Sequence, residues 1–270
     1  MGCGSRFFTD WTNVDFESGH PAVQSHDLSQ GIPFGDDSFD VVYHSHVLEH
    51  FTRSAGLKFI KDCYRVLKKE GILRIAVPDL EAIAKIYLMQ IDRVRSDYNE
   101  NTKADYEWSI LEMYDQVIRS EKGGEIAKLW AKQDLPNEQW IKTRVGDEFM
   151  RFREILKNEA EARALKDFKS NKKIRFKYLT QVLNKIPWIS KINTLMKMLK
   201  IARFRQSGEI HQWMYDSFSL SELLKQAGFN NIKVVDAYNS NIPNWQKYKW
   251  LDVENGKVRK PDSLFIEAVK

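Results

Sequence analysis

The stretch HSHVLEHF, residues 44–51, gathers more potential catalytic side chains than any other part of this 270-residue chain. It holds His46, Glu49 and His50 in the spacing H-x-x-E-H. On a helix, His46 and His50 would lie one turn apart on the same face, as zinc ligands do, with Glu49 as a candidate general base. One activity that this pattern indicates is therefore zinc-dependent hydrolysis.

The neighbouring residues predict a different setting for the same side chains. FDVVYHS reads as a buried strand, and the apolar residues between Leu57 and Leu67 follow helical spacing. Gly71 is expected to end that helix, and ILRIAVPDL is expected to form the next strand, stopped by Pro78. Strand, helix and strand in this order predict a parallel sheet with covering helices, and His46 would follow the carboxyl end of a strand.

Glycines and acids follow the other predicted strands. Gly2-Cys3-Gly4-Ser5 is a turn whose glycines allow a ligand to approach the backbone closely. Asp15 ends the β-prone run WTNVDF, where a carboxylate can accept from ribose hydroxyls, and Asp27 ends the weaker run PAVQSHDL, where it could accept from an adenine amine. Because open α/β sheets bind ligands beyond the carboxyl ends of their strands, these positions indicate a cofactor that contains a nucleoside.

Several of these segments, taken together, resemble the class I S-adenosylmethionine-dependent methyltransferases, and most closely a type-11-like branch associated with glycan biosynthesis. The segments are GCGS, NVDF, HDL, IPFGDDSFDVVYHSHVLEHF, CYRVLKKEGILRIAVPDL, GEIHQWMYDSFSLSELLKQAGF and KPDSLFIEAVK. The resemblance covers residues 2–84 and 208–270. It implies a Rossmann-like α/β fold, with a mostly parallel sheet and an antiparallel last strand, and S-adenosylmethionine as the cofactor.

The resemblance also implies a role for each of the residues at the strand ends. The glycine turn would approach the methionine part of the cofactor, Asp15 would hold the ribose, and Asp27 with Leu28 would frame the adenine. Ser45 and His46 would face the methyl group. The implied cofactor site comprises Gly2, Cys3, Gly4, Asp15, Asp27, Leu28 and Ser45.

The implied reaction is in-line transfer of a methyl group from a sulfonium to an acceptor oxygen or nitrogen. The protein then contributes proximity, orientation and, for a hydroxyl acceptor, a base. His46 is the first candidate for this catalytic base and His211 the second, because histidine titrates near neutral pH. The alternative is that His46 and His50 only cap or pack the following helix. The expected acceptor is a sugar or glycan hydroxyl.

The chain departs from the family at its beginning. In the family a strand precedes the glycine turn, whereas here Met1 stands in that place. That strand is the middle of the sheet, so its neighbours are expected to lack a partner, as if the first strand were missing. Either the chain start is misassigned, or the protein is a non-catalytic relative that binds a partner without a complete cofactor site. Only ten residues separate Gly4 from Asp15, which predicts a loop or a very short helix there.

A helical insertion or lid is predicted for residues 85–207, between core segments 1–84 and 208–270. Gly123-Gly124 breaks its helical pattern and indicates either a hinge or an ordinary helix–turn–helix connection. The candidate acceptor contacts are Asp115, Gln116 and Arg119 from the insertion and His50 from the core.

Positive charge is concentrated in residues 163–205, which contain 13 Lys or Arg and one acid. This segment carries +12 although the whole chain carries +5. A lid with a solvated basic face, contact with an anionic membrane, and guidance of a lipid-linked glycan acceptor are all consistent with it. We recognise no RNA- or DNA-binding module, so nucleic acid is the less favoured partner.

Composition limits the remaining possibilities. Two cysteines, Cys3 and Cys63, exclude a disulfide framework and a cysteine-rich zinc cluster. The chain shows no secretory signal and no run of the roughly 20 apolar residues that span a bilayer. We expect a cytoplasmic protein, at most peripheral to the inner face of the membrane. The sequence predicts no metal site, because H-x-x-E-H needs a third ligand that no motif supplies.

Overall fold

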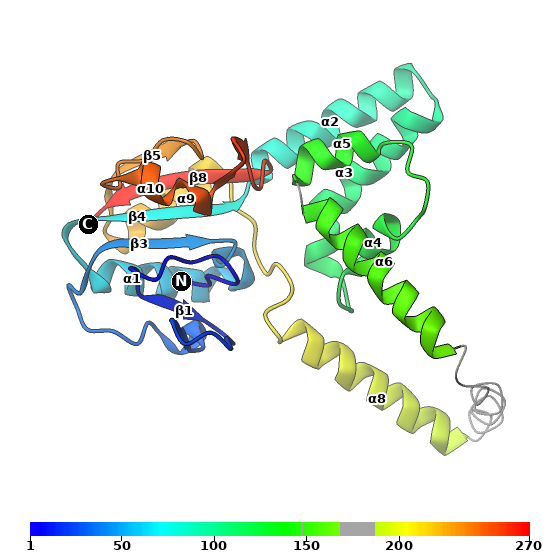
Figure 1. Cartoon of the computed structure of the whole chain (residues 1–270), viewed down its shortest axis with the longest axis horizontal. Helices are drawn as coiled ribbons and strands as arrows, with labels where there is room; N and C mark the ends of the chain where they lie inside the picture. Colours follow the sequence, from blue (N-terminus) through cyan, green and yellow to red (C-terminus); the bar gives the residue numbers. More distant parts are fainter. Residues whose placement is uncertain (147, 168–186) are drawn as a thin grey trace.

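The computed structural model describes residues 1–146, 148–167 and 187–270. A twisted sheet in two hydrogen-bonded parts forms its core and lies on the left in Figure 1, beside the helices of the insertion. Its strands are β1 (Asn13–Asp15), β2 (Val23–Ser25), β3 (Phe39–Ser45), β4 (Leu67–Pro78), β5 (Asn230–Val235) and β8 (Ser263–Val269). β1 pairs in parallel with β2, and β3 in parallel with β4. β8 runs antiparallel between β4 and β5. The expected Rossmann-like α/β sheet, mostly parallel with an antiparallel last strand, is confirmed.

A gap separates β1 from β3, and the beginning of the chain crosses it. The Met1 amino group donates to the Tyr43 carbonyl at 2.8 Å, and the Gly2 amide donates to the Val14 carbonyl at 2.8 Å. These two bonds link the two parts of the sheet where strand-to-strand pairing is lacking. Residues 5–12, all of them described, form turns and extended segments, in agreement with the expected loop.

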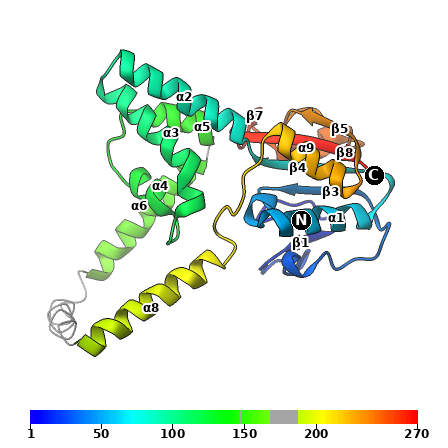
Figure 2. The same ribbon diagram turned by 180° about the vertical axis from the view of Figure 1, so that it is seen from behind.

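Both faces of the four-stranded part of the sheet are covered. The α-helices of the core are α1 (Arg53–Val66), α9 (Ser217–Ala227) and the short α10 (Trp245–Tyr248). Leu73, Ile75 and Val77 of β4 share one hydrophobic cluster with residues of α1 and α9 (Figure 2). Ile72, one position out of phase, packs in the cluster around Trp245 on the other side. This period of two is what a strand buried on both faces produces.

The junction of α1 and β4 differs from its prediction. The helix ends at Val66, and the strand begins at once with Leu67, so Gly71 lies inside β4 rather than after the helix. A side chain at Gly71 would place its Cβ 2.7 Å from the Lys68 carbonyl oxygen. The pairing of β3 with β4 also shifts register near this point. A bulged strand therefore uses the glycine that the sequence assigned to a helix end.

The run DSFSLSELLKQAGF, residues 216–229, predicts a capped amphipathic helix that ends at Gly228, and the structure confirms it as α9. The Asp216 carboxylate accepts from the Ser219 amide at 2.7 Å, and the Ser219 hydroxyl accepts from the Asp216 amide at 3.1 Å. Gly228 closes the helix with a left-handed conformation, φ 106°. This reciprocal capping box satisfies amides that the first turn would otherwise leave unpaired.

The residues between β4 and α9 are mostly helical where they are described. The helices are α2 (Leu80–Ser96), α3 (Glu100–Ile118), α4 (Gly124–Trp130), α5 (Glu138–Val145), α6 (Glu148–Asp167) and α8 (Pro187–Arg205). α2 begins directly after β4, so one helix crosses the expected boundary at residues 84 and 85. Figure 1 shows α2 to α6 on one side of the sheet, with α8 extending away from it. Part of the basic segment, 168–186, lies outside the described residues.

The insertion leaves and re-enters the core at one place. The Leu80 amide donates to the Tyr215 carbonyl at 2.9 Å, and Asp79 and Tyr215 form an isolated parallel bridge. A separate cluster of Trp108, Trp130, Ile141 and Phe149 forms the centre of the insertion. Among the described helices, none has both the length and the apolar content needed to cross a lipid bilayer.

Candidate functional site

Two cavities meet at the carboxyl end of β3. The first, about 320 Å³, is lined by the Gly2–Ser5 turn, by Ser45 and by the edge of β3. The second, about 280 Å³, lies between the core and the insertion and is lined by residues that include His50 and His211. The side chains of His46 and Lys260 line both cavities. A small molecule in each cavity would therefore meet the other at His46.

The backbone of the glycine turn lines the first cavity and leaves space for a ligand to approach it closely. Gly4 adopts φ 54°, and a Cβ built on it would meet nothing within 4 Å. Its amide donates to the Asp15 Oδ2 at 2.6 Å, which fixes the turn. Gly2 also has positive φ, but a Cβ there would collide with the Val47 side chain. Gly4 thus leaves open space on the side of the cavity, as a bound nucleoside cofactor requires.

Asp27 and Leu28, the residues expected at the adenine end, lie outside the lining of the first cavity. Asp27 caps η1 (Leu28–Gln30), with its carboxylate accepting from the Ser29 amide at 2.9 Å. The hydrogen bonds from Ser29 lower the pKa of Asp27. Asp15, Asp27 and Leu28 are not among the residues that line the first cavity, whereas the expected Gly2, Cys3, Gly4 and Ser45 are. For Asp15 the structure shows a contact with the turn, as described above, and the ribose contact stays a prediction.

His46 is held by contacts on both of its ring nitrogens. Nδ1 lies 3.1 Å from Glu49 Oε1, and Nε2 lies 2.9 Å from the Ser263 hydroxyl. The carboxylate of Glu49 favours the tautomer with a proton on Nδ1, which leaves Nε2 free to accept a proton. The backbone of His46 has φ 55°, an uncommon value for a residue with a side chain, and its amide donates to the Ala76 carbonyl. This conformation turns the chain from β3 into η2 (Leu48–His50).

Glu49 lies at the bottom of the site and is fully buried. Burial by itself would raise the pKa of its carboxyl, but His46, and then His211 and His50, lower that pKa to about 2. Neither Oε1 nor Oε2 accepts a well-formed hydrogen bond from a described residue, although Oε1 lies 3.1 Å from His46 Nδ1. Glu49 is therefore an ionised carboxylate enclosed by three imidazole rings.

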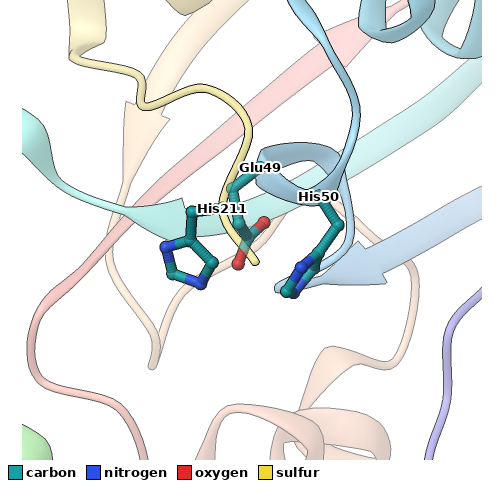
Figure 3. Close-up of side chains that lie close together, drawn as sticks. All are labelled: Glu49, His50 and His211. Atoms are coloured by element: carbon teal, nitrogen blue, oxygen red, sulfur yellow. The ribbon is translucent and has the colours of Figure 1, made fainter. Parts of the chain in front are cut away.

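His50 and His211 face the same carboxylate (Figure 3). Their ring centroids are 5.0 Å apart, and the His50 Nδ1 lies 3.1 Å from the Ile210 carbonyl oxygen. Burial lowers the pKa of His211 to about 3, although the Glu49 charge acts in the opposite direction. His211 is consequently a neutral imidazole at physiological pH, which is the form that can accept a proton or bind a metal ion.

The H-x-x-E-H stretch is not a helix face. His46 follows β3 with a left-handed backbone, and only Leu48–His50 form a 3₁₀ turn. The helical spacing that suggested zinc hydrolysis through His46 and His50 is therefore wrong. Nor do His46 and His50 cap the following helix, because Thr52 does so by accepting from the Ala55 amide. The Glu49 carbonyl instead accepts from the amides of Gln212 and Trp213, holding the segment that returns from the insertion.

The candidate acceptor contacts divide into two groups. Gln116, Arg119 and His50 line the second cavity. Asp115 does not: its Oδ1 accepts from the Glu125 amide at 2.6 Å at the start of α4, and it lines a separate hollow. In the structure the Asp115 carboxylate caps the start of α4, and its role as an acceptor contact stays a prediction. This cap explains the glycine pair, because a Cβ at Gly124 would overlap the Asp115 carboxylate.

Sequence reasoning did not identify several residues that line the second cavity. Trp108 and Trp130 stack with ring centroids 5.9 Å apart and form an aromatic wall. Lys260, just before the last strand, lines the cavity, and Ser263 at the first position of that strand contacts His46 without lining the cavity. The polar residues just before β8 were a usable signal, since this strand neighbours β4 in the sheet. The tryptophans gave no such signal, because their positions depend on how α3 and α4 fold back.

The comparisons with known proteins bear on the part of the chain that forms these strand ends. Residues 12–75 match the model of the type 11 family described as a methyltransferase domain, so the match begins after the glycine turn and ends within β4. No curated protein matches the chain. Members of the matched family use S-adenosylmethionine as the methyl donor. Residues 12–75 are therefore similar to a methyltransferase domain, and the sheet topology is consistent with a Rossmann-like methyltransferase fold.

Proposed function

We propose that this protein transfers a methyl group from S-adenosylmethionine to a hydroxyl of a sugar or glycan acceptor. One observation carries the proposal: His46 lines the cavity beside the glycine turn and also the cavity beneath the insertion. A base for methyl transfer to a hydroxyl must reach the acceptor oxygen next to the donor. His46 occupies that position.

Different residues of the chain bind the cofactor and accept the proton in the proposed reaction. Bound S-adenosylmethionine supplies a methyl group on a sulfonium, which is already a good leaving group. Ser45 and the glycine turn would hold this cofactor in the first cavity. Nε2 of His46 takes the proton of the acceptor hydroxyl, in the place that the Ser263 hydroxyl occupies in the structure. Glu49 then stabilises the imidazolium through Nδ1.

The second cavity has features that favour a sugar as the acceptor. The stacked rings of Trp108 and Trp130 offer an apolar wall, and Gln116 and Arg119 offer hydrogen bonds. The indole N–H of Trp130 and the Nε of Arg119 are buried and have no partner among the described residues. A ligand with several hydroxyls would satisfy such groups, which are costly to leave unpaired.

A transfer assay tests this proposal. The purified protein is incubated with methyl-labelled S-adenosylmethionine and with two matched panels, sugars with free hydroxyls and amino compounds of similar size. We expect label in the sugar panel only. Label in the amino panel alone would contradict the choice of oxygen, and the absence of label in both would favour the non-catalytic alternative, for which the gap between β1 and β3 is the supporting observation.

We also propose that α8 contacts an anionic membrane, which would bring the enzyme to a lipid-linked acceptor. Ile192, Leu195, Met196 and Leu199 are spaced to form one apolar stripe, and each is between 45% and 60% exposed. Lysines and arginines accompany this stripe along the helix. An exposed amphipathic basic helix is suited to anionic lipid surfaces.

Flotation with liposomes tests the membrane contact. The double variant Leu195→Gln, Met196→Gln is expected to lose most of the binding to anionic vesicles. Its matched control replaces Leu88 and Met89 of α2, which are exposed to a similar degree, by Gln. Equal flotation of the two variants, or equal flotation of the wild type on anionic and neutral vesicles, would contradict the proposal.

A further inference from the structure

We propose that Glu49, His50 and His211 form a site for a divalent transition-metal ion, best suited to Zn²⁺, beside the acceptor cavity. The three side chains offer one carboxylate oxygen and two imidazole nitrogens, and these atoms all lie within 4.8 Å of one another (Figure 3). Two histidines and one glutamate are a ligand set of catalytic zinc sites. The role of the ion in catalysis rests on the proposed function. The existence of the metal site is argued from the geometry of the three side chains and does not depend on that function.

The burial of Glu49 is the first independent observation for this site. Its side chain is fully buried, and no Lys or Arg among the described residues forms an ion pair with it. Neither of its oxygens has a well-formed hydrogen bond among the described residues, although His46 Nδ1 lies 3.1 Å from Oε1. Removing a carboxylate from water without a cation is costly, and the described groups that lower the pKa of Glu49 are the histidines His46, His211 and His50. A divalent cation would offset that cost.

The second observation is the orientation of His50. Its Nδ1 lies 3.1 Å from the Ile210 carbonyl oxygen, which can only accept a hydrogen bond. The proton of the neutral ring is therefore on Nδ1, and the lone pair on Nε2 is free to bind a metal. Metal-binding histidines usually donate their second N–H in this way, which fixes the tautomer and the ring orientation.

Backbone hydrogen bonds connect the two segments that carry the three ligands. The His211 amide donates to the Gln116 carbonyl at 2.9 Å, and the Gln212 amide donates to the Glu49 carbonyl at 2.7 Å. These bonds hold the segment with His211 against the turn with Glu49 and His50. Ligand atoms of a tetrahedral zinc ion lie about 3.4 Å apart, so the group must close by about 1.4 Å.

The site opens toward the acceptor. Glu49, His50 and His211 all line the second cavity, so a fourth coordination position faces the ligand there. An ion at this position polarises a hydroxyl and lowers its pKa. The proton then passes from the acceptor oxygen to Nε2 of His46, which lines the same cavity. The ion would thus act on the same hydroxyl as the base.

Metal titration of the whole chain tests the inference. Apo protein is titrated calorimetrically with Zn²⁺ alone, and the metal content after dialysis is measured by elemental analysis. We expect one ion per chain. Glu49→Gln and His211→Gln should each weaken binding by at least about 100-fold, since even the loss of outer-shell partners costs 10- to 100-fold. His20→Gln, which changes an exposed histidine outside both cavities, should bind like the wild type.

Three results separate the possible outcomes. Zn²⁺ binding that survives unchanged in Glu49→Gln would place the ion elsewhere and overturn the site, as would a wild-type chain that binds no ion. A visible Co²⁺ spectrum typical of four-coordination, lost in His211→Gln while far-UV circular dichroism is unchanged, would support it without dependence on stability. The same samples are also titrated with S-adenosylmethionine. Cofactor binding without metal binding would contradict the metal site and leave the proposed methyltransferase function standing.

Discussion

Replacing His46 by Gln is expected to lower the turnover of methyl transfer by about 10² to 10⁴, the usual contribution of a general base. Gln keeps a polar side chain of similar reach, but it cannot take a proton. The affinity for S-adenosylmethionine should change little, because the glycine turn and Ser45 provide most of the first cavity. Initial rates at saturating cofactor and acceptor, together with a cofactor titration, measure both quantities.

Two further variants make this prediction specific. Glu49→Gln removes the charge that orients His46 and should cost less than His46→Gln, because the ring itself remains. His20→Gln changes a histidine that packs on Phe7 outside the acceptor cavity, and it should leave turnover as in the wild type. A His46→Gln protein that keeps more than about a tenth of the wild-type turnover would show that another group accepts the proton.

The largest expected effect on stability is at Arg74 of β4. Its guanidinium is fully buried and donates to Asp252 Oδ2 at 2.8 Å and to Glu267 Oε1 at 2.8 Å. It also donates to the carbonyls of Asn239 and Asp236, and the Trp245 ring lies 4.3 Å from Cζ. With a further bond from Nε to Asp252 Oδ2 at 3.0 Å, all five of its N–H groups are used. One side chain joins the central strand to the segment that covers this face of the sheet.

Arg74→Met is expected to lower the free energy of unfolding by about 3 to 5 kcal/mol, because Asp252 and Glu267 would remain buried without their cation. Urea denaturation followed by circular dichroism measures this change. Lys85→Met is the control: it removes the cation of an exposed pair with Glu81 on α2, and a surface pair contributes at most about 1 kcal/mol. Similar losses for the two variants would mean that the buried network is not a principal source of stability.

The parts of the fold that the sequence predicted are those with a local cause. The helix before Gly228 has its capping residues and its apolar period within one segment, and the strand FDVVYHS has the apolar run of a buried strand. The junction at Gly71 was mispredicted because a glycine after lysines resembles a helix end, while its actual role depends on the pairing of β4 with β3. Local patterns cannot report such a pairing.

The site shows the same division between local and distant causes. The placement of His46 at the mouth of the sheet follows from its position after β3. The partners that give it a function are far away in sequence, since Ser263 lies 217 residues further along the chain. Asp115 is predicted as an acceptor contact, and the fold of α4 turns its carboxylate toward a helix start. The approach of His211 to Glu49 likewise depends on the return of the insertion to the core.

Calorimetric titration of S-adenosylmethionine into the wild type, Asp15→Ala and Asp10→Ala tests the central claim most directly. Asp15 fixes the glycine turn through Gly4, whereas Asp10 is an acid in the same loop that pairs with Lys247 outside the first cavity. We predict that one cofactor binds per wild-type chain. Asp15→Ala should bind it about 10- to 100-fold more weakly, because a hydrogen bond to a charged group is lost. Asp10→Ala should bind it as tightly as the wild type. A wild-type chain that binds no cofactor, or an Asp15→Ala chain that binds it equally well, would contradict the account.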